Sequence, residues 1–383
     1  MVWVTILIVV FALFSTASAE PQEVHALYLP GKFLCSQVVV ADVKSHVESG
    51  AANAVVIDLR DNGTFFNHCM SEVTGWLKDH NVYLIGRIVV GQDSIIADAR
   101  RDMAVHVADQ QIALERVLQS IDRMVERTPE VKKAALLKTK LEALDRWYGD
   151  GRKKPLWFSG ALERHRYWLD PASPDLARLT SGVAEWASTL GFAEINLDYI
   201  RFPTDGDMQN MRYPFWNGEQ SKYEVIGRFA SSVVEDIKRR VPGMKVSADI
   251  FGIVCVNGAE SSTGQRVKDF TVFDYLACMG YASHFRCGDF GFSDPNQKPY
   301  EVTKTVALGL ARHLAGVTKK PFIRPWIEGF TIPSIYQCST WRPPSAKERF
   351  RQQIRALAEH GIKSWMIWNT ADEPKPLYEK IFR

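Results

Sequence analysis

Several common sequence signals are missing from this chain of 383 residues. Its 47 Lys and Arg against 44 Asp and Glu leave a net charge of only +3, and no basic block occurs, which argues against nucleic acid or anionic lipid as the main partner. No Cys-x-x-Cys pair occurs among the six cysteines, which excludes a zinc ribbon or a thioredoxin-type site. No Gly-x-Ser-x-Gly elbow precedes a helix, which argues against an α/β-hydrolase. These absences remove function classes without selecting one.

The hydrophobic run near the N-terminus is too short to span a bilayer comfortably. It covers 13 residues from Val2 to Phe14, and Ser15 to Ala19 then end in the small-x-small pattern that a signal peptidase prefers. No Lys or Arg precedes the run, which departs from the usual signal peptide. We expect residues 1–19 to be a signal peptide, with an uncleaved membrane anchor as the alternative. The mature chain, residues 20–383, would then be secreted or periplasmic, with no integral membrane span. In such an oxidising compartment some cysteines pair, but their spacing selects no connectivity.

Apolar, β-rich runs alternate with amphipathic patterns along the mature chain. Eight runs predict strands, at His25–Leu29, Ala54–Leu59, Val82–Val90, Glu194–Phe202, Lys245–Phe251, Tyr275–Ala282, Pro321–Ile327 and Ser364–Trp368. Spacings of three and four predict helices at Gln37–Ser49, Glu72–Asp79, Pro174–Leu190, Tyr223–Arg240, Glu301–Leu314 and Ala346–Glu359. Eight strands, most of them followed by a helix, predict a single α/β domain with the (β/α)8 TIM barrel fold. The rival, a doubly wound sheet, lacks its glycine-rich phosphate loop after the first strand.

One segment does not fit this repeat. Residues from Gln111 to Glu126 and from Lys132 to Trp147 each carry a helical pattern, and Thr128-Pro129 separates them. We expect a helical hairpin inserted after the third strand, at about residues 111–149. It would be either a packing appendage or dimer surface, or a lid over the barrel mouth. The oligomeric state does not follow from the sequence.

Polar residues late in the predicted strands are the candidates for chemistry, because active sites of TIM barrels lie at the carboxyl ends of their strands. In the fourth strand Asn196 and Asp198 lie on the same face. A carboxylate in such an apolar strand costs desolvation energy unless it has a partner or a catalytic role. Arg201, three residues on, could keep Asp198 charged or form a structural ion pair with it. In the fifth strand Ser247 and Asp249 repeat the pattern.

The other predicted strands add acids, cations and aromatic rings to the same rim. These residues are Asp58, Tyr281, His284, Arg324, Trp326, Glu328 and Trp368. Glycoside hydrolysis needs such a set, with one carboxylate as nucleophile or base, another as proton donor, and flat rings that stack on sugars. His284 could instead be a metal ligand, but no second His has ligand spacing, so we expect no metal and no cofactor.

The fourth predicted strand also carries a family resemblance. The segment Ile195-Asn-Leu-Asp198-Tyr-Ile-Arg201-Phe-Pro203 resembles the signature Q-x-D-Y-I-R-F-P of the bacterial putative glycoside hydrolases, long a domain family of unknown function, which is counted among the amylase-related glycosidase barrels. Looser matches run in order along nearly the whole mature chain. They include Ala54–Asp58, Trp168–Pro171, Val246–Gly252, Met279–His284, Arg324–Trp326 and Trp365–Asn369.

This resemblance implies a secreted or envelope barrel with Asp198 as nucleophile and Asp249 as acid/base. Amylase-type barrels usually place Glu on the fifth strand, so Glu328 competes for the role of proton donor. The helical insertion is also longer than the family leads one to expect.

We therefore predict retaining hydrolysis of an envelope or extracellular polysaccharide. In this hypothesis Arg201 keeps Asp198 charged. The rings of Tyr281, Trp326 and Trp368 stack on the sugar. The side chains of Asp58, Arg324 and His284 form hydrogen bonds with sugar hydroxyls. The alternatives are a carbohydrate-binding or scaffold barrel without catalysis and a metal-assisted deacetylase.

Overall fold

The computed structural model describes residues 20–61, 63–100, 102–107, 168–204, 208, 211–339 and 342–382. Within these residues eight parallel strands close into a barrel, because β1 pairs with both β2 and β14. The strands are β1 (His25–Leu29), β2 (Ala54–Asp61), β4 (Tyr83–Val89), β6 (Glu194–Asp198), β8 (Lys245–Phe251), β11 (Tyr275–Met279), β12 with β13 (Phe322–Ile323 and Trp326–Glu328) and β14 (Trp365–Trp368). The predicted (β/α)8 fold is confirmed, and all eight predicted strands are present.

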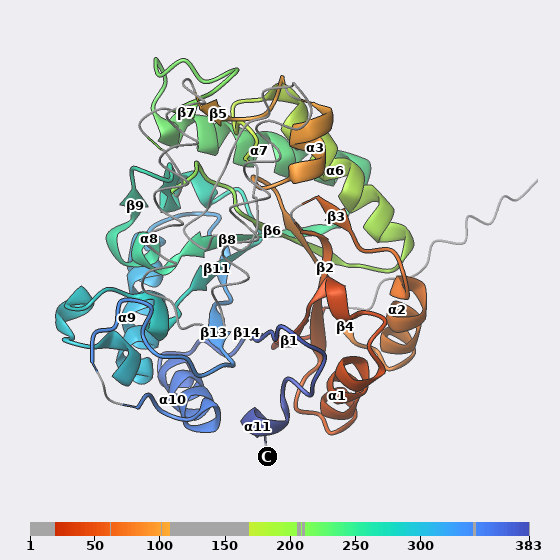
Figure 1. Cartoon of the computed structure of the whole chain (residues 1–383), viewed down its shortest axis with the longest axis vertical. Coiled ribbons are helices and arrows are strands. Elements are labelled where there is room, and N and C mark those ends of the chain that lie inside the picture. The colour runs from red at the N-terminus through yellow and green to blue at the C-terminus, as the bar shows by residue number, and fades with distance from the viewer. Residues whose placement is uncertain are drawn as a thin grey trace, which may run out of the picture.

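Helices surround the barrel, as the ring of coiled ribbons in Figure 1 shows. All six predicted helices form, as α1 (Gln37–Glu48), α2 (Met70–Asp79), α6 (Pro174–Thr189), α7 (Lys222–Arg240), α9 (Pro299–His313) and α10 (Ala346–Ala358). Shorter helices that the sequence did not predict are α3 (Ser94–Ala99), α8 (Gly252–Asn257) and α11 (Glu379–Phe382). Short strands outside the barrel are β3 (Thr64–Phe65), β5 (His106–Val107), β7 (Met211–Arg212), β9 (Ala259–Glu260) and β10 (Gln265–Arg266).

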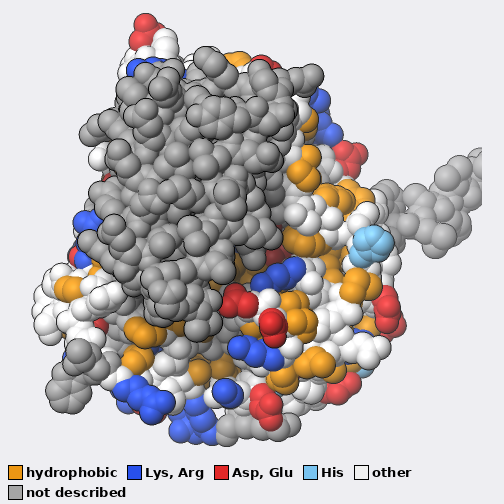
Figure 2. All heavy atoms as spheres, in the orientation of Figure 1, with side chains coloured by type: hydrophobic (Ala, Val, Ile, Leu, Met, Phe, Trp, Pro, Cys, Tyr) orange, Lys and Arg blue, Asp and Glu red, His pale blue; other side chains and the backbone are white. Residues whose placement is uncertain are grey.

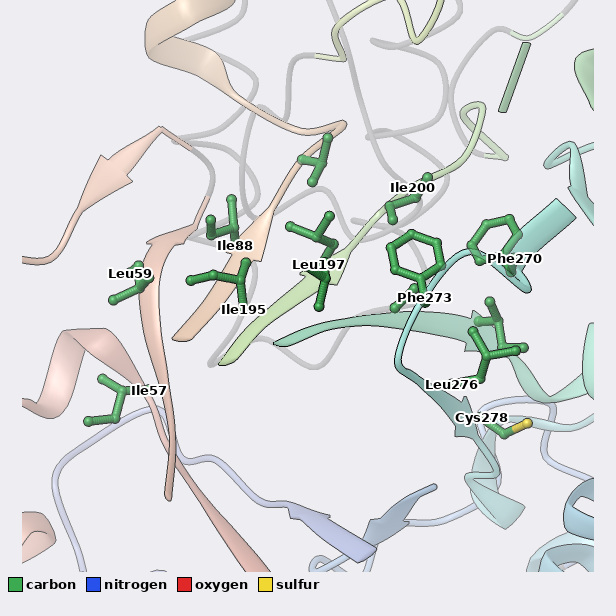
Figure 3. Packing of buried hydrophobic residues seen from close by; sticks show 14 of the residues in the cluster. Ile57, Leu59, Ile88, Ile195, Leu197, Ile200, Phe270, Phe273, Leu276 and Cys278 are labelled. Carbon is green, nitrogen blue, oxygen red and sulfur yellow. The ribbon is translucent and has the colours of Figure 1, made fainter. Parts of the chain in front are cut away.

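The alternation of side chains along each strand produces two buried layers. One set of residues points outward and packs under the helices. Figure 3 shows part of this layer, including Ile195 and Leu197 of β6, and the register places Leu197 beside Ile88 of β4. The other set fills the barrel interior, where Tyr28, Tyr83 and other apolar side chains form a separate cluster. Polar groups inside the barrel therefore need partners from neighbouring strands.

Local sequence fixes the ends of the helices. Ser221 begins α7 with a capping box, in which its side chain and that of Glu224 satisfy each other's backbone N–H groups. Ser36 and Ser345 cap α1 and α10 by accepting a backbone N–H. These caps set where each helix begins relative to the strand before it.

All six cysteines pair in three disulfides. Cys35–Cys69 joins the loop after β1 to the start of α2, and Cys255–Cys278 joins α8 to β11. Cys287–Cys338 joins the loop after β11 to the loop after β13. The sequence had predicted pairing of some cysteines without a connectivity, and the structure supplies one.

Two predictions lie outside the described residues. These are the signal peptide at residues 1–19 and the helical insertion at about residues 111–149. Among the described residues, no helix has the length and apolarity needed to cross a membrane.

Candidate active site

The carboxyl end of the barrel holds a buried charge network centred on Arg87 of β4. Its Nη2 donates to Oδ2 of Asp198 at 2.6 Å, and its Nη1 donates to Oδ1 of Asp58 at 2.7 Å. Burial lowers the pKa of Arg87, but the charges of Asp198 and Asp58 raise it more, and the net pKa lies well above the usual value. The guanidinium therefore stays charged and supplies the counter-charge that Asp198 needs in a buried site.

Asp58 is the second anchor of this network. Besides Arg87, its carboxylate accepts the hydroxyl of Tyr28 at 2.5 Å and the backbone N–H of Gly31 at 3.1 Å. It is 2% exposed and does not line the pocket described below. The sequence placed Asp58 against sugar hydroxyls, whereas the structure uses it to orient Arg87.

Asp198 lies where β6 ends and the chain turns sharply. Tyr199, the next residue, adopts a left-handed backbone with φ of 58°, and its N–H donates to Oδ1 of Asp198 at 2.7 Å. Positive φ is unfavourable for a bulky residue, and such strain is concentrated at functional sites. The turn and Arg87 together hold both oxygens of Asp198.

Asp249 of β8 has a different environment. Its Oδ1 accepts from Nδ2 of Asn196 and from Nε1 of Trp326, both at 2.8 Å, while its Oδ2 accepts no hydrogen bond within the described part of the chain. Burial raises the pKa of Asp249 well above its usual value, and the negative charge of Asp198 raises it further. The environment of Asp249 therefore favours its protonated form, beside an acid that is paired with a guanidinium.

A pocket of about 850 Å³ opens over these two carboxylates. Its described lining includes predicted site residues from three strands and two loops, namely Asp198, Arg201, Asp249, Tyr281, His284 and Trp368. The structure thus brings six of the ten predicted site residues to one cavity. Figure 2 shows acidic and basic side chains near the middle of the face that it draws, below the residues drawn in grey.

The aromatic residues divide into two groups. Trp368 lines the pocket and stacks on Tyr28 with ring centroids 4.2 Å apart, and Tyr281 lines it from the loop after β11. Burial, followed by the charges of Asp249 and Asp198, raises the pKa of Tyr281 well above its usual value, so its hydroxyl stays protonated. Trp326 is only 1% exposed and is absent from the described lining. It therefore orients Asp249 from behind instead of forming the predicted stacking wall.

Arg201 does not serve as the counterion that the sequence suggested. Its Nη1 donates to the backbone oxygen of Phe202 and to Oγ1 of Thr204, at 3.2 and 3.1 Å. Its guanidinium lies 4.6 Å from the ring centroid of Trp168 and 4.9 Å from that of Phe251. The left-handed turn at Tyr199 ends the strand alternation, so the side chain of Arg201 does not point to the same side as that of Asp198.

The structure does not bring Arg324 and Glu328 into the pocket. Arg324 lies at the amino-terminal end of the barrel interior, where its Nη2 is bonded to the buried carboxylate of Glu194. Glu328 is 0% exposed, and its oxygens accept from two backbone N–H groups, one hydroxyl and Arg349 of α10. A carboxylate with all its acceptor positions filled has none left to protonate a leaving group, so the geometry favours Asp249 as the acid.

Arg87 is the central residue that the sequence reasoning missed. It shares the parity of Tyr83 and Ile85 in a strand that is buried along its whole length. The argument used for Asp198, that a lone charge in an apolar strand needs a partner, applies equally to Arg87 and would have found it.

Within the described residues no group of three or more His, Cys, Asp or Glu side chains could hold a metal ion. His284 accordingly lies among aromatic rings, with the centroid of Tyr281 at 5.5 Å and that of Phe330 at 6.1 Å.

The comparisons with known proteins agree with this architecture. The family model described as "Putative glycosyl hydrolase domain" matches residues 26–373. The chain belongs to this glycosyl hydrolase family. The resemblance inferred from the strand that carries Asp198 is thereby confirmed. No curated protein matches this family member.

A solved β-galactosidase structure shows the same fold at low sequence identity. The cold-adapted β-galactosidase from Rahnella sp. R3 is 11% identical to this glycosyl hydrolase family member, with a TM-score of 0.54, and the match covers 94% of this chain and 53% of that one. An α-galactosidase from Thermus thermophilus is 11% identical with a TM-score of 0.48, and the match covers 92% and 59% of the two chains. The chain thus spans less than two thirds of either galactosidase. At this identity the likeness to the β-galactosidase concerns the barrel fold alone.

Proposed function

We propose that this protein hydrolyses glycosidic bonds of an envelope or extracellular polysaccharide by a retaining mechanism, with Asp198 as nucleophile and Asp249 as acid/base. One observation carries the proposal. Two carboxylates in one pocket have different environments, because Asp198 is paired with the guanidinium of Arg87 whereas burial and the charge of Asp198 raise the pKa of Asp249; glycosidases divide the roles of nucleophile and acid between two such carboxyl groups.

The mechanism follows from the hydrogen bonds of each acid. An oxygen of Asp198 attacks the anomeric carbon while Oδ2 of Asp249, which accepts no hydrogen bond from the described residues, gives its proton to the departing glycosidic oxygen. The bond to the leaving sugar breaks as the bond to Asp198 forms. Asp249, now a carboxylate, then takes a proton from water, and this water displaces Asp198 from the anomeric carbon.

The surrounding residues support the charges of both steps. Arg87 holds the charge of Asp198 before attack and after release, and Asn196 and Trp326 stabilise the Asp249 carboxylate between the steps. Trp368 and Tyr281 offer aromatic faces for a sugar ring, and Arg201 offers a cation in the same lining.

The proposed location outside the cytosol has separate support. Disulfides persist in oxidising compartments and are rare in the cytosol. All six cysteines of this chain are paired, and the N-terminal sequence has the pattern of a signal peptide.

The test screens the disulfide-bonded protein on a panel of polysaccharides for new reducing ends, beside Asp198→Asn and Asp249→Asn. Asp175→Asn, which alters an acid in exposed ion pairs of α6, serves as the matched control. We expect turnover by the wild type and the control only, with a first product of unchanged anomeric configuration by proton NMR. An inverted product would refute retention, and full turnover by Asp198→Asn would remove Asp198 from the chemistry. Glycan binding without turnover by any form would favour the non-catalytic binding barrel.

A further inference from the structure

A chain of hydrogen bonds runs from α10 to the wall of the pocket. Nη1 of Arg349 donates to Oε2 of Glu328 at 2.6 Å, and the Ser283 hydroxyl is bonded to Oε1 of the same carboxylate. The Ser283 oxygen lies 2.9 Å from Nδ1 of His284. Arg349, Glu328 and Ser283 are all 0% exposed, so solvent does not compete for these bonds.

The direction of each proton follows from the chemistry of the groups. Glu328 faces three fixed donors, namely the guanidinium of Arg349 and the backbone N–H groups of Ala282 and Ser283 at 3.0 and 3.2 Å. Such a carboxylate is an acceptor only, so the single hydroxyl proton of Ser283 must point to it. The Ser283 oxygen can then only accept from His284, and Nδ1 of His284 must carry a proton.

The other ring nitrogen of His284, Nε2, is left to interact with a ligand in the pocket. Nε2 forms no hydrogen bond within the described residues, and His284 lines the cavity that holds Asp198 and Asp249. Burial lowers the pKa of His284 below its usual value and outweighs the opposing charge of Glu328, so the ring is neutral at physiological pH. A neutral ring with its proton on Nδ1 presents a bare acceptor at Nε2.

We propose that His284 is a specificity-determining residue whose Nε2 accepts a hydrogen bond from a substrate hydroxyl or amide N–H, and that Glu328 acts through Ser283 as the positioning group that fixes this tautomer. The inference rests on the proposed function for the identity of the substrate as a glycan. It assigns Glu328 a role that differs from proton donation, and it explains why a carboxylate at the end of β13 is fully buried and fully bonded.

This arrangement selects among sugars. The charged groups in the described pocket lining have a hydrogen-bonding sense fixed by their charge, since a guanidinium only donates and an ionised carboxylate only accepts. A neutral nitrogen acceptor instead requires a donor at one position of the ligand, so a deoxy or O-methylated sugar at that position leaves Nε2 desolvated and unpaired.

The decisive experiment is 15N NMR of the disulfide-bonded full chain labelled at histidine. The chain has nine histidines, and the signals of His284 are assigned by their loss in His284→Gln. We expect the wild-type protein at pH 7 to show a protonated Nδ1 and an unprotonated Nε2. A proton on Nε2 would overturn the proposal without any further variant.

Ser283→Ala tests the relay itself. It removes the hydroxyl and keeps the backbone N–H that Glu328 accepts. We expect the Nε2-protonated form, which free histidine prefers, to become populated, whereas Ser334→Ala, in the neighbouring loop, leaves the tautomer unchanged. A spectrum of Ser283→Ala identical to that of the wild type would refute the relay.

Kinetics on the polysaccharide found by the screen separate this role from catalysis. Ser283→Ala is expected to raise KM about tenfold, the loss of roughly one hydrogen bond, while kcat changes less. Equal loss in kcat with unchanged KM would refute a binding role for His284. The NMR result does not depend on turnover, so failure of the proposed function and failure of this inference are distinguishable.

Discussion

Replacing Trp326 with Phe should move the basic limb of the pH–rate profile to higher pH. Nε1 of Trp326 donates to Oδ1 of Asp249 at 2.8 Å and stabilises the ionised form of this acid, so the bond lowers a pKa that burial and Asp198 raise. In the proposed mechanism Asp249 must be protonated in the free enzyme, and kcat/KM falls as pH rises through its pKa. Removing the donor raises that pKa further, and the protonated acid survives to higher pH.

The size of the displacement follows from the energy of the lost bond. A hydrogen bond to a charged group contributes about 1.5–3 kcal/mol, and 1.36 kcal/mol corresponds to one pH unit. Both partners are at most 1% exposed, so solvent screening does not reduce this value. The basic limb of Trp326→Phe should therefore lie about one to two pH units above that of the wild type.

The assay is kcat/KM against pH, measured as reducing ends released from the polysaccharide found by the screen. Trp365→Phe is the matched control, because Trp365 is also buried in the core but stacks on His25, away from both carboxylates. Asn196→Ala removes the second donor to the same oxygen and should displace the limb in the same direction. A basic limb that stays in place or moves to lower pH in both Trp326→Phe and Asn196→Ala would refute the assignment of Asp249 as the acid.

Three further predictions concern stability. Folding raises the pKa of Asp249, and such an acid lowers the stability of the folded state at every pH above its unfolded pKa of about 3.9. Asp249→Asn should therefore raise the melting temperature at pH 7 and change it little at pH 3.5. No rise at pH 7 would contradict the raised pKa. Arg87→Met leaves Asp58 and Asp198 without their shared counterion and should lower the free energy of unfolding by about 3–5 kcal/mol in urea titrations. Arg178→Met, which removes an exposed ion pair, should change it little. Equal effects of the two variants would refute a stabilising role of the buried network. Replacing the Cys35–Cys69 disulfide by two serines should cost about 2–4 kcal/mol in the same assay, and an unchanged midpoint would contradict the pairing.

The fold could be predicted because burial on both faces gives each barrel strand an apolar run that is short and bounded. The structure departs from the predicted strands mainly in the seventh, which is split into β12 and β13 around Pro325. Proline lacks the N–H that a continuous ladder requires, so the break has a local cause. The short helices α3 and α8 were missed because six residues are too few to show a helical period.

The site was predicted less completely, since parity gives the face of a strand and not the depth within the barrel. Arg324 and Glu328 share a parity, yet four residues at about 3.3 Å each separate them by roughly 13 Å along the strand. Arg324 consequently meets Glu194 near the barrel floor. Proximity in sequence misled in a different way for Arg201, because the left-handed backbone of Tyr199 turns the chain directly after Asp198. The true counterion, Arg87, lies 111 residues away and reaches Asp198 only through the pairing of β4 with β6.

The Cys287–Cys338 disulfide has a practical consequence for any search for activity. It ties together two loops that carry Arg286 and Tyr336, both part of the pocket lining. In protein made in a reducing cytosol, the strands would still pair into a barrel, but no covalent bond would connect these two loops. The pocket entrance would then have a different shape when the protein is screened on polysaccharides. Preparation by an exporting or otherwise oxidising route is thus a condition of the assay.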